Sequence, residues 1–226
     1  MVENDILYFR ACHKAGLVKE PFLEIGSAIV EHSLVNNLCR VAQELGLSKT
    51  FGTDLEAGPG VDFTADFSLP PDQFKAGWTH GQFQTVAIFN VLEHTYDPIT
   101  ILTNALSCVA PGGTLCVAAP GSWALHDYPK DYVRLLPHWF EEFGQRNGLK
   151  IYRDHFCYLS DFGLIPVDQL NIKGQYQFPT YINSTRRSTP FRYWRSRILH
   201  RLFNTYGRSH FFPQATIGCV YQVSPA

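Results

Sequence analysis

The segment PFLEIG, residues 21–26, carries the strongest signal for the type of fold. It is a short apolar run closed by a glycine, which is typical of a parallel strand buried inside a sheet. Residues 30–46 follow with apolar side chains at helical spacing, and Gly46 suits the end of a helix. A buried strand followed at once by a helix predicts the first unit of an α/β sheet.

The alternation of strand and helix continues along the chain. Helices are also expected over residues 2–18, 97–109 and 136–148, with Asp97 and Pro98 starting the second of them. The other strands are expected over residues 50–56, 61–66, 83–90, 114–120, 149–156 and 216–224. This order predicts an α/β fold with a doubly wound, seven-stranded and mostly parallel Rossmann-like sheet.

One domain is expected over residues 1–226, because this length is ordinary for a single α/β domain. Residues 111–113, Pro-Gly-Gly, are expected to turn into the fifth strand. Residues 160–213 break the rhythm and are rich in Pro, Tyr, Arg and Ser. We interpret them as an insertion, or lid, before the last strand, with one short helix near residues 190–207.

The net charge of −1 hides a strong asymmetry. No acidic residue follows Asp168, whereas eight basic residues do, which leaves −9 for residues 1–168. Such a split predicts that the basic C-terminal segment meets something acidic. Two partners remain open, namely the acidic body of the same chain and an anionic ligand.

Six cysteines are present without a C-x-x-C pair, which indicates buried thiols in a reducing cytosol and no metal site. The chain has no run of about 18 apolar residues, and its start lacks the pattern of a secretory signal. We therefore expect a cytoplasmic chain without a transmembrane segment. Monomer and homodimer both remain open.

Polar residues and a glycine stand at the ends of the predicted strands, namely Glu24, Gly26, Asp54, Asp66 and Asn90. Open parallel sheets bind ligands beyond the carboxyl ends of their strands. A nucleoside ligand needs a close approach of the backbone, which glycine allows, and hydrogen-bond acceptors, which carboxylates supply. The pattern therefore predicts one ligand lying across several strand ends.

The ordered motifs FLEIG, FGTDLE, VDFTADF, IFNVLEHTYDP and VAPGGTLCVAAP lie within residues 20–120. Together they resemble the successive motifs of class I S-adenosylmethionine-dependent methyltransferases, in particular the small-molecule group with Leu-Glu-His after the fourth strand. The later tract HDYPKDYVRLLPHWFEEF resembles a segment that follows the fifth strand in many of these enzymes. The resemblance implies methyltransferase activity with S-adenosyl-L-methionine as the cofactor.

The resemblance also implies roles for individual residues. Glu24 and Gly26 would line the methionine part of the cofactor, and Asp54 would accept hydrogen bonds from the ribose hydroxyls. Asp66, with Phe67 beside it, would contact the adenine. The whole cofactor set expected from the resemblance is Glu24, Gly26, Ser27, Asp54, Leu55, Asp66, Phe67 and Asn90.

Asn90 would contact the amino-acid end of the cofactor or its sulfonium side. One position departs from the family pattern, because a second glycine is usual two residues after Gly26 and Ala28 stands there. A chain that binds the cofactor weakly, or does not catalyse, therefore remains open. A dinucleotide-binding dehydrogenase is the nearest rival on such a sheet, but residues 24–32 lack the G-x-G-x-x-G pattern.

His94 and His126 are the candidate catalytic bases, because they follow the fourth and fifth strands and histidine titrates near neutrality. Methyl transfer from a sulfonium is a one-step displacement, in which the protein mainly positions the nucleophile and excludes water. A hydroxyl acceptor additionally needs a base near its proton. A purely structural role, in capping or packing, remains open for His94.

The candidate substrate-binding residues are Asp127, Tyr128, Tyr132, Arg197 and Arg201. The first three follow His126, and the two arginines belong to the expected lid helix, where they would bind phosphate or carboxylate. Solvent exposure of these arginines, docking on an anionic membrane surface, and contact with nucleic acid remain open. The acidic remainder of the chain argues against a broad nucleic-acid surface.

The sequence therefore predicts an enzyme that methylates a small molecule on oxygen, such as an anionic, glycosylated or lipid-linked metabolite. Two alternatives remain open. One is a methyltransferase that modifies RNA or protein, and the other is a catalytically inactive, methyltransferase-like binding protein.

Overall fold

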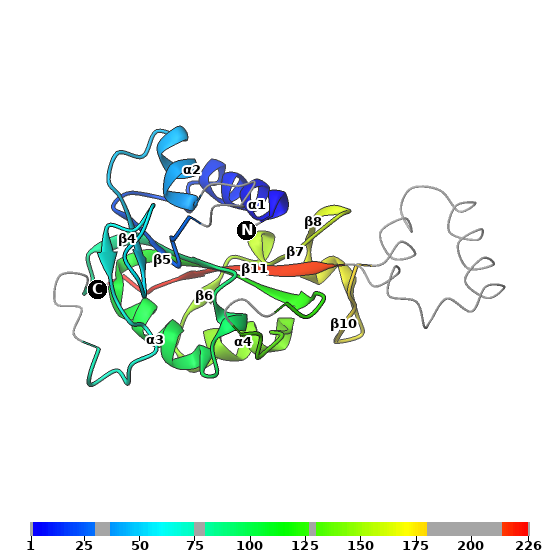
Figure 1. Cartoon of the computed structure of the whole chain (residues 1–226). Helices are drawn as coiled ribbons and strands as arrows, with labels where there is room; N and C mark the ends of the chain where they lie inside the picture. The colour runs from blue at the N-terminus through cyan, green and yellow to red at the C-terminus, as the bar shows by residue number, and fades with distance from the viewer. Residues whose placement is uncertain (1, 30–36, 75–79, 127–129, 180–213, 226) are drawn as a thin grey trace.

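The computed structural model describes residues 2–29, 37–74, 80–126, 130–179 and 214–225. In this part of the chain, helices cover both faces of a central sheet (Figure 1). The helices are α1 Glu3–Lys14, α2 Leu38–Glu44, α3 Pro98–Cys108 and α4 Pro137–Arg146. The strands of the central sheet are β1 Phe22–Ile25, β2 Thr50–Asp54, β3 Phe63–Thr64, β4 Phe83–Phe89, β5 Val109–Ser122, β6 Lys150–Ile151, β7 Cys157–Ser160, β8 Gly163–Pro166 and β11 Ala215–Gln222.

The central sheet has the order β3-β2-β1-β4-β5-β11-β7-β8, with β6 also pairing with β11. Strands β1 to β5 pair in parallel, whereas β11 runs antiparallel to β5 and β7. The chain leaves β1 toward β2 on one side and continues through β4 and β5 on the other, which creates a topological switch point at β1 and β4. The predicted doubly wound, mostly parallel α/β sheet is confirmed, with nine strands among the described residues in place of the seven expected.

The prediction of a single strand over residues 149–156 is wrong. The chain instead forms β6, a 3-10 turn at Arg153–His155, and then β7. The polar run in the middle interrupts the strand, because Arg153 leaves the sheet to contact Glu141 and Asp168. The remaining extra strand is β8, which pairs antiparallel with β7.

The helix predicted over residues 30–46 is shorter, since α2 begins at Leu38 after Asn37, whose side chain accepts a hydrogen bond from the Arg40 backbone N–H. Residues 30–36 lie outside the described part. The predicted turn at residues 111–113 is part of the long strand β5, where Gly112 has a φ of +75° and the pairing with β4 shifts register. Asp97 caps α3 as predicted.

Side chains of β4 alternate between two cores, as expected for a strand buried on both faces. Val86 and Ile88 pack with the core under α3 and α4, whereas Ala87 and Phe89 pack with the core under α1 and α2. After β8, a 3-10 turn at Val167–Leu170 leads into a hairpin of β9 Asn171–Ile172 and β10 Gln175–Tyr176.

The helix expected near residues 190–207 lies outside the described residues, so a lid over residues 160–213 stays a prediction. Among the helices described, none has the length and apolar character needed to cross a bilayer.

Candidate functional site

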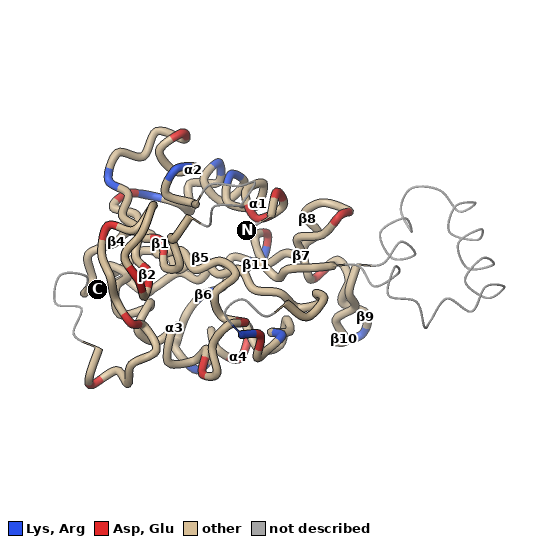
Figure 2. Tube along the Cα trace, viewed as in Figure 1, with Lys and Arg blue, Asp and Glu red and all other residues tan. Residues whose placement is uncertain are grey.

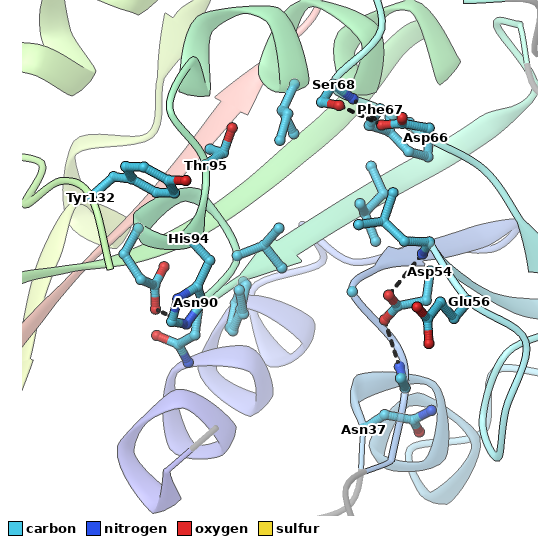
Figure 3. Close-up of a pocket in the computed structure, with 18 of the residues that line it drawn as sticks. Asn37, Asp54, Glu56, Asp66, Phe67, Ser68, Asn90, His94, Thr95 and Tyr132 are labelled. Atoms are coloured by element: carbon cyan, nitrogen blue, oxygen red, sulfur yellow. Dashed lines mark hydrogen bonds and ion pairs between the residues drawn. The ribbon is translucent and has the colours of Figure 1, made fainter. Parts of the chain in front are cut away.

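A pocket of about 1050 Å³ opens at the carboxyl ends of β1, β2 and β4, where the topological switch point lies (Figure 3). Small-molecule pockets commonly enclose roughly 300–1,000 Å³, so this one has room for a nucleoside and a second small molecule. Most of the described residues singled out from the sequence line it, namely Gly26, Asp54, Leu55, Asp66, Phe67, Asn90, His94, His126 and Tyr132. Asp127, Tyr128, Arg197 and Arg201 lie outside the described part of the chain.

The pocket has two chemically different ends, which Figure 3 shows on opposite sides of the view. We call the part around Asp54, Glu56 and Asp66 the acidic end, and the part around Asn90 and His94 the histidine end. Among the described lining residues, five carry carboxylates and none is Lys or Arg. Figure 2 likewise shows acidic positions on the chain beside β2. The pocket therefore favours a ligand that carries positive charge.

The loop after β1 requires glycine at position 26. Gly26 has a φ of +82°, and a Cβ atom there would lie 2.3 Å from Cγ2 of Val91. Ala28, the departure from the family pattern, is held by a hydrogen bond of 3.0 Å from its backbone N–H to Oδ2 of Asp54. Alanine at this position is therefore compatible with a loop that reaches the carboxyl end of β2.

The acidic end is built from carboxylates that the local backbone orients. Oδ1 of Asp54 accepts the Leu55 backbone N–H at 2.8 Å. Oδ1 of Asp66 accepts both the backbone N–H and the hydroxyl of Ser68, at 2.8 and 2.6 Å. These bonds hold the carboxylates at the pocket wall without neutralising them, because each partner is an uncharged donor.

Glu24 and Ser27 are not among the lining residues. Glu24 is buried, and its carboxylate accepts the backbone N–H groups of Leu38 and Cys39 at 2.9 and 2.8 Å. It thus satisfies the first donors of α2, which otherwise have no partner within the helix. The role expected for Glu24, lining the methionine part of the cofactor, is therefore not what its contacts show.

The histidine end begins where β4 stops. Asn90 adopts a φ of +54°, a left-handed conformation that Asn tolerates better than most residues. The next residues form a 3-10 turn, Leu92–His94. Nδ1 of His94 lies 2.7 Å from the Lys130 carbonyl oxygen, so Nδ1 carries the hydrogen and Nε2 keeps a lone pair in the neutral ring. Burial lowers the pKa of His94, which favours this neutral form.

Glu93 is buried at the same end, and neither of its carboxylate oxygens has a hydrogen-bond partner within the described structure. Oε1 lies 3.8 Å from Nε2 of His94, too far for a hydrogen bond. Burial raises the pKa of Glu93 to about 7. An unsatisfied buried carboxyl costs stability, and such exceptions are expected mainly at functional sites.

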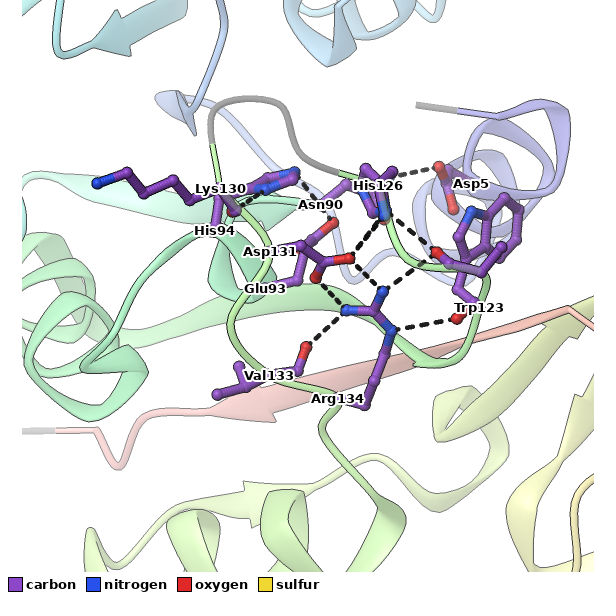
Figure 4. A network of polar contacts seen from close by, with 11 residues as sticks. Asp5, Asn90, Glu93, His94, Trp123, His126, Lys130, Asp131, Val133 and Arg134 are labelled. Carbon is purple, nitrogen blue, oxygen red and sulfur yellow. Dashed lines mark hydrogen bonds and ion pairs between the residues drawn. The ribbon is translucent and has the colours of Figure 1, made fainter.

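His126 completes the histidine end (Figure 4). Its ring stands edge-on to that of His94, with 4.9 Å between the centroids. Its backbone N–H donates to Asp131 at 2.8 Å, and Nδ1 lies 3.4 Å from the same carboxylate. Arg134 donates two hydrogen bonds to Asp131 and holds the pKa of that carboxyl well below its usual range. Arg134 is therefore already paired with an acid of this end.

Glu93, His94 and His126 could together hold a metal ion, since one ligand atom from each lies within 4.8 Å of the other two. The sequence predicts no metal site. That prediction stays untested.

Two further contributors were not singled out from the sequence. Glu93 lies inside the Leu-Glu-His run, so its position after the fourth strand could have indicated it. Asp5 on α1 accepts a hydrogen bond of 2.7 Å from the Asn90 side-chain amide. No local signal links two residues that lie so far apart in the chain.

Comparison with solved structures identifies the fold. The S-adenosylmethionine-dependent methyltransferase of Archaeoglobus fulgidus matches with a TM-score of 0.53 and 14% identity, over 97% of this chain and 94% of that one. The [4+2]-cyclase SpnF matches with a TM-score of 0.54 and 13% identity, over 98% of this chain and 82% of that one. The chain has the class I methyltransferase fold, as its motifs predict. The cyclase shows that this fold does not fix the reaction.

Sequence comparison adds a narrower likeness. The ubiquinone biosynthesis O-methyltransferase of Xanthomonas campestris pv. campestris is 27% identical over 136 residues, which cover 57% of this chain and 52% of that protein. The protein of the same name from Xanthomonas euvesicatoria pv. vesicatoria is 29% identical over the same coverage. The chain therefore spans about half the length of the curated relatives it matches. No protein-family model matches it.

Proposed function

We propose that the chain is a methyltransferase that binds S-adenosylmethionine in this pocket and methylates a hydroxyl oxygen of a small molecule. The observation that carries the proposal is the convergence of Gly26, Asp54, Asp66, Asn90 and His94 on one pocket at the switch point of the sheet. The names of the relatives support a hydroxyl oxygen as the acceptor atom.

The described residues fit this cofactor chemically. The loop at Gly26 permits close approach of a ligand to the backbone, and Asp54 and Asp66 offer acceptors to ribose hydroxyls and an adenine amine. The cofactor carries positive charge on its sulfonium and ammonium groups, which suits a lining with carboxylates and without Lys or Arg among the described residues. Asn90, at the histidine end, would meet the amino-acid part.

His94 is proposed as the proton acceptor. When bound, S-adenosylmethionine supplies an electrophilic methyl group and is released as a neutral thioether after the carbon–sulfur bond breaks. Nε2 of His94 would take the hydroxyl proton of the acceptor as its oxygen bonds to the methyl carbon. The resulting imidazolium donates from Nδ1 to the Lys130 carbonyl and faces the Glu93 carboxylate, so both neighbours stabilise its charge.

Aromatic residues at the histidine end indicate the shape of the acceptor. Trp123, Tyr96 and Tyr132 line the pocket, and the rings of the two tyrosines lie 6.2 Å apart, edge to face. Aromatic walls favour a flat, apolar acceptor that carries a hydroxyl group, and catechol is the simplest probe of that kind. An anionic acceptor would depend on arginines outside the described residues.

Calorimetry with S-adenosylhomocysteine tests the cofactor half of the proposal. Wild-type protein should bind, and Asp54→Ala should weaken binding by roughly 10- to 100-fold, because it removes acceptors for two hydroxyls. Asp72→Ala, an exposed change outside the pocket lining, is the matched control and should bind like wild type. Absence of binding by the wild type would overturn the proposal.

Incubation with radiolabelled S-adenosylmethionine and catechol tests the reaction, with benzene-1,2-diamine and thiophenol as nitrogen and sulfur acceptors. Methyl transfer to catechol above the other two supports oxygen as the acceptor atom. Cofactor binding without transfer to any of the three would favour the non-catalytic alternative. The outcome therefore separates the enzyme from a binding protein with the same fold.

A further inference from the structure

Helix α1 brings a buried acid to the histidine end of the pocket. Asp5 is fully buried, although it lies in the first turn of an N-terminal helix. Its Oδ2 accepts the Val2 backbone N–H at 2.8 Å. The same oxygen accepts the Asn90 side-chain N–H at 2.7 Å (Figure 4). Its Oδ1 is buried without a hydrogen-bond partner. Capping alone does not require a second contact to β4 or complete burial, since capping acids function at exposed positions.

The contact determines which atom Asn90 presents to the pocket. An amide side chain has one donor group and one acceptor atom, and it can turn over to exchange them. Oδ2 of Asp5 already accepts the Val2 backbone N–H, so it acts as an acceptor toward Asn90 as well and bonds to Nδ2 of the amide. Nδ2 is thereby directed toward α1, and the carbonyl oxygen Oδ1 is the atom left for a ligand in the pocket that Asn90 lines.

We propose that Asp5 is a positioning residue that orients the Asn90 amide, so that its oxygen receives the ammonium group at the amino-acid end of the cofactor. This inference rests on the proposed function. An amide turned the other way would point N–H hydrogens at a cation and repel it. The backbone supports the arrangement, because Asn90 holds a φ of +54° and donates its own N–H to Ala118 at 2.8 Å. Asp5 therefore selects between two otherwise similar side-chain orientations.

Two ligands distinguish this role from a structural one. S-adenosylhomocysteine has the amino-acid end, whereas 5′-methylthioadenosine keeps the nucleoside and lacks that end. In calorimetry, Asp5→Ala should weaken S-adenosylhomocysteine by roughly 10- to 100-fold, the usual effect of losing a hydrogen bond to a charged group. Binding of 5′-methylthioadenosine should change less than about twofold.

Asn90→Gly is the companion variant, because it removes the amide and still accommodates the positive φ. It should show the same loss for S-adenosylhomocysteine, and Asp5→Ala combined with Asn90→Gly should lose no more than Asn90→Gly alone. Glu3→Ala, in the same first turn of α1, is the control and should bind both ligands like wild type.

The outcomes separate cleanly. Equal weakening of both ligands by Asp5→Ala, or no weakening of either, overturns the inference while the proposed function stands. Failure of wild-type protein to bind S-adenosylhomocysteine overturns the proposed function itself. If Asp5→Ala does not fold, Asp5→Asn keeps the size but loses the charge. It should then weaken S-adenosylhomocysteine selectively, by a smaller factor, and an unchanged affinity would overturn the inference.

Discussion

Glu24 and Glu93 are two buried glutamates near the same edge of the sheet, and they differ in their hydrogen-bond partners. Burial raises the pKa of both to about 7. The carboxylate of Glu24, on β1, accepts hydrogen bonds from two backbone N–H groups of α2. Glu93, after β4, has no hydrogen-bond partner for either oxygen in the described structure and lines the pocket. The comparison shows that a satisfied buried acid stabilises the fold, whereas an unsatisfied one is available to a ligand.

His94→Gln should have the largest effect, because it removes the proton acceptor beside Glu93 and keeps a polar side chain of similar size. We expect methyl transfer to catechol to fall roughly 10²- to 10⁴-fold, the usual contribution of a general base. S-adenosylhomocysteine affinity should stay near the wild-type value. His138→Gln, which changes a histidine outside the pocket lining, is the control. A wild-type rate of methyl transfer for His94→Gln would show that His94 is not the proton acceptor. The proposed difference in role between Glu93 and Glu24 would then lose its support.

Glu24→Ala tests the other half of the comparison. It leaves the buried N–H groups of Leu38 and Cys39 without an acceptor, so the free energy of unfolding in urea should fall by about 3 kcal/mol. Glu44→Ala, on the exposed end of the same helix, should change it by less than about 0.5 kcal/mol. Equal effects of the two changes would show that the α2 contacts of Glu24 contribute nothing to stability.

Glu93→Gln should affect stability with the opposite sign. Because the folded pKa of Glu93 lies above its unfolded value, the folded protein holds a proton that the unfolded chain has lost between pH 4.5 and about 7. Wild-type stability therefore falls as pH rises through this window. Relative to wild type, Glu93→Gln should gain about 2 kcal/mol between pH 5 and pH 8, as measured by urea unfolding. A constant difference across these pH values would contradict the raised pKa.

Zinc should have the smallest effect, a several-fold inhibition of transfer to catechol. Zn²⁺ accepts histidine and carboxylate ligands, so it would occupy Nε2 of His94 together with Glu93 and His126. His126→Ala should relieve the inhibition, and Mg²⁺, which prefers oxygen ligands, should not inhibit. Activation by Zn²⁺ would instead mean that the three side chains hold a metal that the reaction uses.

The acidic end of the pocket could be predicted from the sequence because its residues are tied to strand ends. Asp54 ends β2, and Gly26 and Asp66 come just after β1 and β3, while parallel strands end at one edge of the sheet. The role expected for Glu24 was not supported, because the register of β1 turns this side chain toward α2. Because side chains alternate along a strand, a shift of one residue in register moves a side chain from one face of the sheet to the other.

The histidine end could be predicted only in part. His94 and His126 follow neighbouring strands, β4 and β5, so their meeting could be anticipated from strand order. The contacts of Asp5 and Glu93 depend on how α1 packs against the sheet and on the turn after β4. Neither is encoded by a local pattern.

The class of fold could be read from the sequence alone, because apolar periodicity and turn residues act over short stretches of chain. The hydrogen-bond partners of the buried acids Glu24 and Glu93 become visible only in the folded chain. Satisfying a carboxylate requires donors from distant elements, and packing determines whether a glutamate faces α2 or the pocket. The contact between Asp5 on α1 and Asn90 likewise depends on packing, because the two residues lie 85 positions apart in the chain.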